Sequence, residues 1–321
     1  MEQLNLDNSI KQSKNILIIS HINPDGDTLG SMLALRDYIY LNYKKKPEMM
    51  VISKIPKMYE FLYGLKETKN LKDFDKSRIY DLVILVDVAA LDRIADAQIF
   101  FEKATIKAVI DHHKTNSYPA DIRVVNAQAS STGEVLYNIA QDLNWKNNEQ
   151  IAEALYTAIL TDTGGFRFDN TSAQTLKIAS DLVELGAKPQ FIYKNCYEMK
   201  SKTFIMFQAY CLNKAKFEEN DKIAYIVVYK KDFEKFPNEQ DLTEGLVEKL
   251  RMIDSTEVAF MLKEIDNNMF KVSMRSKTLD VAEVCSEFSG GGHKFAAGCV
   301  MRFSADESVK KLINEIKKQD I

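Results

Sequence analysis

Three of the four histidines in this chain lie close to aspartates, at the ends of short apolar runs. In "NILIISHINPDGDT", His21 is followed by Asp25 and Asp27. Two further runs, "DLVILVD" and "KAVIDHH", end in the same residue types, namely Asp87, Asp111, His112 and His113. Such runs are typical of buried strands in a parallel sheet, whose carboxyl ends lie at one edge, where ligands bind. We therefore expect these side chains to lie close together.

Imidazole and carboxylate groups together are typical ligands of a divalent cation. One further carboxylate, Asp162 in "AILTDTGGFRF", ends a predicted helix before a Gly-Gly turn. The candidate metal ligands are therefore His21, Asp25, Asp27, Asp87, His112 and Asp162. A set without thiolates favours Mn²⁺, Mg²⁺, Co²⁺ or Fe²⁺ over structural zinc. Its four aspartates would repel one another, and two divalent cations would neutralise them. The sequence thus predicts a two-metal site bridged by Asp87, which lies between the other strand ends.

A two-metal site of this kind suits the hydrolysis of a phosphoester. The two ions would activate a water molecule for attack on phosphorus and stabilise the charge that develops on the phosphoryl oxygens. His113 would bind a phosphate oxygen or protonate the leaving group. We assign the catalytic role to Asp87, His112 and His113.

Each of these residues also has a purely structural interpretation. A single histidine is more often structural than a metal ligand, and an aspartate after a strand often caps the next helix. The segment "NPDGDT" alone is typical of a turn. The coincidence of three histidines and several aspartates at strand ends favours the metal site.

The pattern along the chain predicts two domains. Strands are expected at residues 15–20, 49–53, 81–87 and 107–113, and helical patterns at 29–43, 131–143, 148–162 and 172–186. This alternation predicts an α/β fold with a doubly wound, mostly parallel sheet over residues 1–190. Residues 191–213 are rich in aromatic side chains, and we interpret them as a helical linker. A base-stacking or dimer surface is the alternative for this segment.

Residues 214–321 have a different pattern and predict a smaller α+β domain. Strands are expected at 222–230, 255–265, 269–276 and 298–303. Helices are expected at 242–253, near 279–288 and at the C-terminal end. We expect this unit to be separate from the first domain.

Composition restricts the class of partner. The chain of 321 residues has a formal net charge of −3 and a pI near 5.9, which argues against a protein that grips long nucleic acid. No apolar run spans a bilayer and the N-terminus is polar, so we expect a soluble cytoplasmic protein with no membrane partner. The four cysteines form no close pair and are expected to be buried thiols.

The motifs "SHINPDGDTLGS", "VDVA", "VIDHHKTN" and "TDTGGFRF" resemble the four motifs of the DHH phosphoesterase superfamily. The resemblance implies two Mn²⁺ ions, with Mg²⁺ or Co²⁺ as alternatives. His21, Asp25 and Asp87 would bind one ion. The other would be bound by Asp27, Asp87, His112 and Asp162. Asp111 would then orient a ligand histidine instead of binding an ion.

The segment "SGGGHKFAAGC" resembles the glycine-rich signature of the substrate domain associated with this family, and "SMRS" resembles the strand end before it. Backbone N–H groups without side chains can approach a phosphate closely, and an arginine can hold it as a fork. The substrate-binding residues implied by the resemblance are Arg275, Ser276, Gly290, Gly291, Gly292 and His293.

The two-domain architecture is similar to that of the NrnA-like group of nanoRNases and pAp phosphatases. That resemblance implies hydrolysis of short RNA oligonucleotides, including pApA, to mononucleotides, and removal of the 3′-phosphate from pAp. It also implies that long duplex nucleic acid is not a substrate. A cyclic di-AMP phosphodiesterase of the same architecture and a non-catalytic nucleotide-binding sensor remain as alternatives, and a homodimer is conceivable.

Overall fold

The structure is a computed structural model, and it describes residues 2–236 and 242–319. The chain divides into two compact units, Met1–Met199 and Lys200–Ile321. The boundary falls inside residues 191–213, which the sequence predicts as a separate linker. Helix α7 (Pro189–Tyr193) and a following π-helical turn (Lys194–Glu198) belong to the first unit, and helix α8 (Lys202–Leu212) to the second. The segment is therefore helical in two pieces and contributes to both units.

The first unit is built on a parallel sheet. Its strands are β1 (Ile16–Ile19), β2 (Glu48–Val51), β3 (Lys69–Asn70), β4 (Leu82–Val86), β5 (Ile106–Asp111) and β6 (Ile122–Val125). Their order is β3-β2-β1-β4-β5-β6, and every pairing is parallel. The strand order reverses between β1 and β4, and in open α/β sheets this switch point is where ligands bind. The predicted α/β, doubly wound fold is confirmed.

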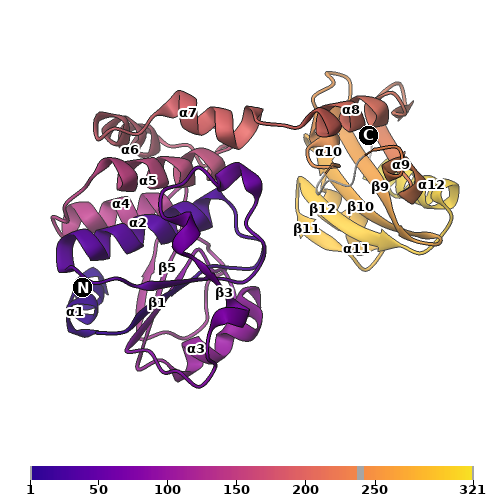
Figure 1. Cartoon of the computed structure of the whole chain (residues 1–321). Coiled ribbons are helices and arrows are strands. Elements are labelled where there is room, and N and C mark those ends of the chain that lie inside the picture. Colours follow the sequence, from indigo (N-terminus) through magenta and orange to yellow (C-terminus); the bar gives the residue numbers. More distant parts are fainter. Residues whose placement is uncertain (1, 237–241, 320–321) are drawn as a thin grey trace. The chain divides into compact units, whose positions relative to one another are not determined.

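Helices cover both faces of this sheet (Figure 1). They are α1 (Glu2–Gln12), α2 (Gly26–Tyr43), α3 (Gln98–Lys103), α4 (Thr132–Asp142), α5 (Glu149–Asp162) and α6 (Ala173–Glu184). Short 3₁₀ turns lie in the connections at Lys57–Tyr59, Leu65–Glu67, Leu71–Asp73 and Leu91–Ala97. In β1, Ile16 and Ile18 pack with α2, whereas Leu17 and Ile19 pack with the core that contains α3. Burial on both faces explains why these strands are uninterrupted apolar runs.

Two glycines allow α2 to lie very close to α5. A Cβ atom on Gly30 would be 2.4 Å from the carbonyl oxygen of Ala154, and one on Gly26 would be 2.4 Å from Oγ1 of Thr161. The close approach brings the start of α2, which carries the candidate ligands Asp25 and Asp27, next to the last turn of α5.

The substitution Gly30→Ala is expected to lower the free energy of unfolding by about 1 to 3 kcal/mol, because a methyl group would overlap backbone that cannot move freely. Urea denaturation measures the change. Gly291→Ala is the control, since a Cβ atom there meets nothing within 4 Å. Equal stability of both variants would show that the helices tolerate a larger separation.

The second unit contains a mixed sheet. Its strands are β7 (Lys216–Glu218), β8 (Ile223–Val228), β9 (Val258–Asp266), β10 (Met269–Ser276), β11 (Gly291–His293) and β12 (Ala296–Met301). The order is β11-β12-β10-β9-β8-β7, and all pairings are antiparallel apart from the parallel pair β8 and β9. Besides α8, its described helices are α9 (Lys230–Phe233), α10 (Leu246–Arg251), α11 (Val281–Ser286) and α12 (Ala305–Ile316), followed by a 3₁₀ turn (Lys317–Gln319).

The helix predicted at 242–253 is shorter in the structure. It begins at Leu246, because Gly245 has a left-handed backbone with φ of +76° and separates it from the preceding turn. Helices α11 and α12 pack on one face of the sheet, and α8 and α10 pack on part of the other. Among the described helices, none combines the length and the apolar character needed to cross a membrane.

Candidate metal centre

The six candidate ligands lie in two sets at the carboxyl ends of the first sheet. One set contains His21, Asp25 and Asp87, and the other contains Asp27, His112 and Asp162. Within each set the donor atoms lie within 4.8 Å of one another. β1, β4 and β5 are neighbours in the sheet, so His21, Asp87 and His112 follow adjacent strand ends. Asp162 joins them from the last turn of α5.

In the first set, His21 is fixed in the tautomer that a ligand needs. Its Nδ1 lies 2.6 Å from the carbonyl oxygen of Ile22, and since a carbonyl can only accept, Nδ1 carries the proton. Nε2 is therefore the ring atom that a cation could bind, and it lies 3.4 Å from Asp87 Oδ2 and 4.0 Å from Asp25 Oδ2. Asp25 also caps α2, since its Oδ1 accepts a hydrogen bond from the backbone N–H of Thr28 at 3.0 Å. Capping uses one oxygen of Asp25 and leaves the other for a cation.

Three carboxylates surround the Nε2 atom of His112, two from the second set and that of Asp87 from the first. This atom lies 3.5 Å from Asp162 Oδ2, 3.7 Å from Asp87 Oδ1 and 3.8 Å from Asp27 Oδ2. These separations are too long for hydrogen bonds. Ligands about 2.1 Å from a shared cation would lie roughly 3 to 3.5 Å apart, so the set is close to the spacing that a divalent cation requires.

Asp27 is held in place by the first residues of α4. Its Oδ2 accepts a hydrogen bond from the N–H of Thr132 at 2.8 Å, and its Oδ1 from the N–H of Gly133 at 2.9 Å. The hydroxyl of Ser31 donates to Oδ1 at 3.1 Å. The N-terminal end of a helix favours a negative charge, which compensates in part for the burial of Asp27.

Asp87 directs one oxygen toward each set. Its Oδ2 faces His21 and accepts a hydrogen bond from the Thr28 hydroxyl at 2.6 Å. Its Oδ1 faces His112 and accepts a hydrogen bond from the Thr132 hydroxyl at 3.2 Å. The residue has a left-handed backbone with φ of +59°, a conformation in which aspartate is enriched. This orientation is the one expected of a carboxylate that bridges two cations.

The buried carboxylates repel one another in the absence of cations. Burial and the negative charge of Asp87 raise the pKa of Asp27 well above its usual range and that of Asp162 to about 7. Burial would also raise the pKa of Asp87, but the hydrogen bond and charge of His21, together with Thr28 and His112, lower it overall. Bound divalent cations would remove this repulsion, so the donor set fits such ions.

Asp111 is fully buried and orients His113. Its Oδ1 accepts hydrogen bonds from His113 Nδ1 and from the N–H of His112, both at 2.8 Å, and its Oδ2 accepts one from Asn116 Nδ2 at 2.6 Å. These bonds leave little capacity for a cation. The bond to Asp111 raises the pKa of His113 to about 9, so its ring carries a proton at neutral pH before any cation binds. The side chain oriented by Asp111 is therefore His113, and for His112 the contact is through its backbone.

Several residues around the centre have no counterpart in the sequence prediction. They are Thr28, Ser31, Asn116, Thr132, Gly133 and Asn170. The Thr28 hydroxyl lies between two members of the first set, 2.5 Å from His21 Nε2 and 2.6 Å from Asp87 Oδ2. A cation in the first set would compete with this hydroxyl for both ligands.

Asn170 connects the two segments that complete the second set. Its Nδ2 donates hydrogen bonds to the carbonyl oxygens of Ser130 at 3.0 Å and of Asp162 at 3.2 Å. Ser130 lies just before Thr132, whose N–H holds Asp27. Asn170 thus fixes the positions of two ligands that are far apart in the sequence.

We expect Asn170→Ala to weaken divalent cation binding by about 10- to 100-fold, the usual cost of removing a group that orients metal ligands. Titration calorimetry of the cation-free protein measures this affinity. Asn42→Ala is the matched control. Its side chain also connects two segments, because its Nδ2 donates to the carbonyl oxygen of Tyr38 and its Oδ1 accepts from the N–H of Lys146, but neither residue is a candidate ligand. An unchanged cation affinity in Asn170→Ala would show that Asn170 does not position the metal ligands.

In the second unit, the register of the sheet places two predicted substrate-binding residues in one row. Arg275 on β10 and His293 on β11 both pair with Ala296 on β12, so the three side chains share a face. The next row contains Ser273, Gly298 and Gly291, which leaves the face smooth. Small residues flanked by a guanidinium and an imidazole suit the approach of a phosphate or nucleotide.

Several of the predicted substrate-binding residues also make contacts within the second unit. Ser276 is buried, and its hydroxyl accepts a hydrogen bond from the N–H of Thr278 at 3.1 Å. A Cβ atom on Gly290 or Gly292 would lie within 2.5 Å of backbone oxygen atoms of β12, so these two glycines allow the strand to form. Arg275 Nε lies 3.0 Å from Glu248 Oε1. Substrate binding by these residues stays a prediction.

Comparison with known proteins identifies the family. The model for the N-terminal domain of the DHH family matches residues 15–159, and the model for the DHHA1 domain matches residues 220–319. A protein of Streptococcus mutans, named as a probable bifunctional oligoribonuclease and PAP phosphatase NrnA, is 30% identical over 289 residues, which are 90% of each chain. The chain belongs to the DHH family of phosphoesterases. DHH phosphoesterases use divalent metal ions, in agreement with the two ligand sets.

Two other proteins resemble this DHH phosphoesterase over most of its length. The bifunctional oligoribonuclease and PAP phosphatase NrnA of Bacillus subtilis is 29% identical, over 91% of each chain. The crystal structure of an exopolyphosphatase-related protein from Bacteroides fragilis matches with a TM-score of 0.90 and 27% identity. That match covers 99% of this chain and 96% of the other.

Proposed function

We propose that this DHH phosphoesterase hydrolyses short RNA oligonucleotides to mononucleotides and releases the 3′-phosphate of pAp, with two Mn²⁺ ions as its physiological cofactors. The observation that carries the proposal is the orientation of Asp87, whose two oxygens face the two ligand sets. Two relatives named as oligoribonuclease and PAP phosphatase, similar over about nine-tenths of the chain, support the choice of substrates. A cytoplasmic location and a homodimer stay predictions from the sequence.

The chain's own residues account for the positions of the reacting groups. Bound divalent cations would lower the pKa of a water molecule and withdraw charge from the phosphoryl oxygens. Asp87 would hold both cation positions at a fixed separation. As the bond from phosphorus to the leaving oxygen breaks, protonated His113 would transfer its Nε2 proton to that oxygen. Asp111 would keep the ring in place through Nδ1.

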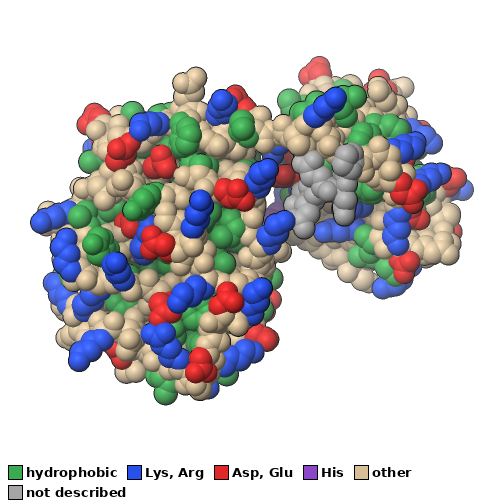
Figure 2. Space-filling view, viewed as in Figure 1, with side chains coloured by type: hydrophobic (Ala, Val, Ile, Leu, Met, Phe, Trp, Pro, Cys, Tyr) green, Lys and Arg blue, Asp and Glu red, His purple; other side chains and the backbone are tan. Residues whose placement is uncertain are grey.

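The second unit would recognise another part of the substrate. Arg275 and His293, in one row of the sheet, would contact a phosphate or a terminal nucleotide. On the face of the first unit shown in Figure 2, acidic and basic side chains are interspersed and form no continuous basic stripe. A protein that follows long nucleic acid normally carries such a stripe. Together with the formal net charge of −3, this face supports our proposal that the substrates are short and that long duplexes are not bound.

A panel of substrates tests this function. Purified protein with Mn²⁺, before and after chelation, is offered pApA, pAp, cyclic di-AMP and pyrophosphate at equal concentration. We expect cation-dependent release of AMP from pApA and of phosphate from pAp, with pyrophosphate spared. Faster hydrolysis of cyclic di-AMP than of pApA would make the protein a cyclic dinucleotide phosphodiesterase. Tight nucleotide binding without turnover under any divalent cation would leave a non-catalytic sensor.

A further inference from the structure

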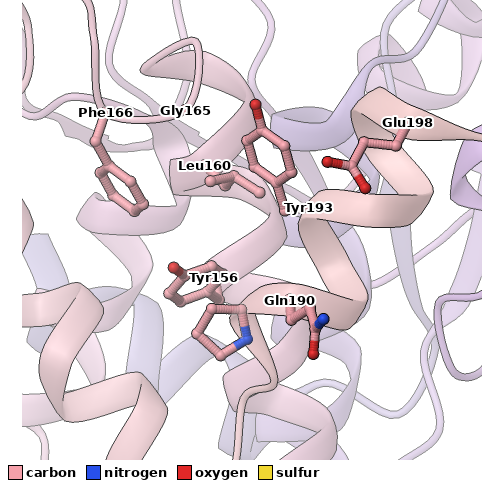
Figure 3. A pocket seen from close by; sticks show the side chains of 8 residues that line it. Tyr156, Leu160, Gly165, Phe166, Gln190, Tyr193 and Glu198 are labelled. Atoms are coloured by element: carbon pink, nitrogen blue, oxygen red, sulfur yellow. The ribbon is translucent and has the colours of Figure 1, made fainter.

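A pocket in the first unit lies beside the last turns of α5, the helix that ends at the candidate ligand Asp162. It has a volume of about 350 Å³ and lies between the end of α5, the loop that follows and α7. Tyr156 and Leu160 line it from α5, Phe166 from the loop and Tyr193 from α7. Figure 3 shows the rings of Tyr156 and Phe166 on one side and the ring of Tyr193 on another. None of the candidate metal ligands lines this pocket.

The walls of the pocket are aromatic and held in place by other rings. Tyr156 and Phe166 contact each other edge to face, with ring centroids 5.8 Å apart. The ring of Tyr193 packs against Tyr197 at 4.9 Å and is 43% exposed, so one part of it remains available. Aromatic walls favour a flat aromatic ligand, and stacking on a nucleobase is tolerant of sequence.

Polar groups at the pocket lack partners within the part of the chain that the structure describes. Tyr156 is only 6% exposed as a residue, and its hydroxyl, which makes no hydrogen bond there, is not among the fully buried atoms that lack a partner, so it is open to the pocket. The side chains of Gln190 and Glu198 also line the pocket; both residues are exposed and have no side-chain hydrogen bond or ion pair within residues 2–236 and 242–319, so a ligand would compete only with water for them. These groups match the donors and acceptors on the edge of a nucleobase. The pocket lining contains Glu198 and no lysine or arginine, so it does not suit a phosphate.

The pocket is connected to the site of the reaction through the chain around Asp162. Leu160 and Gly165, which line the pocket, lie on either side of Asp162 in the sequence. Two residues of a helix rise by about 3 Å, so the backbones of Leu160 and Asp162 lie within one turn of each other, and their side chains leave α5 on different faces. Phe166 has a left-handed backbone with φ of +62°, which is rare for an aromatic residue, and its N–H donates to Thr163 Oγ1 at 3.0 Å. Strain of this kind is concentrated at binding and catalytic sites.

We propose that this pocket is a nucleobase subsite, which holds the base of the nucleotide next to the scissile phosphate. Tyr193 stacks on the base, and Tyr156, Gln190 and Glu198 contact its polar edge. The identity of the ligand as part of an oligonucleotide rests on the proposed function. This subsite gives the first unit its own preference for nucleotides over simple phosphate esters. It also gives a function to Tyr193, one of the aromatic residues of the segment 191–213, which the catalytic centre does not use.

A combination of protein and substrate variants tests the subsite by binding alone. Titration calorimetry with the Mn²⁺-loaded protein uses a dinucleotide in which a methylene group replaces the scissile ester oxygen. Two further analogues lack the base on one nucleoside or on the other. Tyr193→Ala is expected to weaken binding of the parent dinucleotide by about 5- to 100-fold, the range found for loss of one stacked base. On the wild type, one of the two abasic analogues should bind more weakly than the parent dinucleotide by the same factor. On Tyr193→Ala, that analogue and the parent should bind with equal affinity.

Two matched variants control for structural effects. Tyr193→Phe keeps the ring and is expected to bind the dinucleotide as the wild type does. Phe191→Ala removes another aromatic side chain of α7 with a similar exposed fraction, 45%, but its ring contacts Phe61 at 5.4 Å and does not line the pocket. It should leave the affinity unchanged. Wild-type affinity in Tyr193→Ala, or equal weakening of the parent and both abasic analogues, would overturn the subsite.

The remaining outcomes separate this proposal from the proposed function. Base-dependent binding that Tyr193→Ala abolishes, in a protein that hydrolyses no short RNA with any divalent cation, would keep the subsite and overturn the function. Hydrolysis of short RNA without any dependence on either base would keep the proposed function and overturn the subsite. Sedimentation of the same variants adds a third possibility. A change from dimer to monomer in Tyr193→Ala, with unchanged dinucleotide affinity, would assign the aromatic surface to contact between copies and overturn the subsite.

Discussion

Asp87→Asn is expected to lower kcat/KM for pApA by roughly a thousandfold or more. Each oxygen of Asp87 faces a different ligand set, so one substitution weakens both cation positions at once. Loss of the charge stabilisation that bound cations supply costs several kcal/mol in the transition state, and about 4 kcal/mol corresponds to a thousandfold. Steady-state kinetics at saturating Mn²⁺ measure the loss, and titration calorimetry should show fewer than two bound ions.

Asparagine is the informative replacement because it is isosteric with aspartate and also tolerates a left-handed backbone, such as the φ of +59° at position 87. Asp92→Asn is the matched control, since Asp92 is an exposed aspartate that follows soon after β4 and lies in neither ligand set. Its activity should equal that of the wild type. Activity of Asp87→Asn within tenfold of the wild type would contradict a bridging carboxylate.

Divalent cations are expected to stabilise the protein strongly, and more so at pH 8 than at pH 5.5. In the cation-free protein, burial and neighbouring charges raise the pKa of Asp162 to about 7 and that of Asp27 well above its usual range. A carboxyl group with a raised pKa in the folded state contributes stability that is present below about pH 4, the unfolded value, and lost as the pH rises through about 7. Cations bind the deprotonated form and offset this loss.

Thermal unfolding with and without a chelator measures the effect. At a free cation concentration about a thousand times the dissociation constant, linkage predicts a stabilisation of about 4 kcal/mol. Asp162→Asn removes one of the repelling carboxylates, so its cation-free form should be more stable at pH 8 than that of the wild type. A cation-dependent shift that is equal at both pH values, or absent, would be inconsistent with cations held by this carboxylate cluster.

The fold was predictable where a strand is buried on both faces, because its sequence is then an uninterrupted apolar run. β1 and β4 are buried on both faces, and their uninterrupted apolar runs predict strands within a residue or two of the observed bounds. β3 contains only Lys69 and Asn70, which carry no such pattern. β11 consists of two glycines and a histidine, residues depleted in strands, and it pairs only because β12 offers an edge.

The candidate site was predictable to the extent that its residues are rare and follow strands. Histidines at the ends of β1 and β5 are informative because the chain has only four. Thr132 and Gly133 bind Asp27 across more than a hundred residues of sequence, and the local sequence around them predicts only a helix start. Asn170 lies in a segment typical of a turn. Its role depends on the packing of two distant segments, which a local pattern does not encode.

Hydrolysis of short RNA by cations at two positions bridged by Asp87 is tested by a length series. In this series, 5′-labelled RNA of two, five, ten and twenty-four nucleotides is offered with Mn²⁺ at equal concentration. We expect kcat/KM to be highest for the shortest substrates, to fall steeply with length, and to be lost on chelation and in Asp87→Asn. Equal or faster cleavage of the longest strand, or hydrolysis that survives chelation, would contradict this expectation.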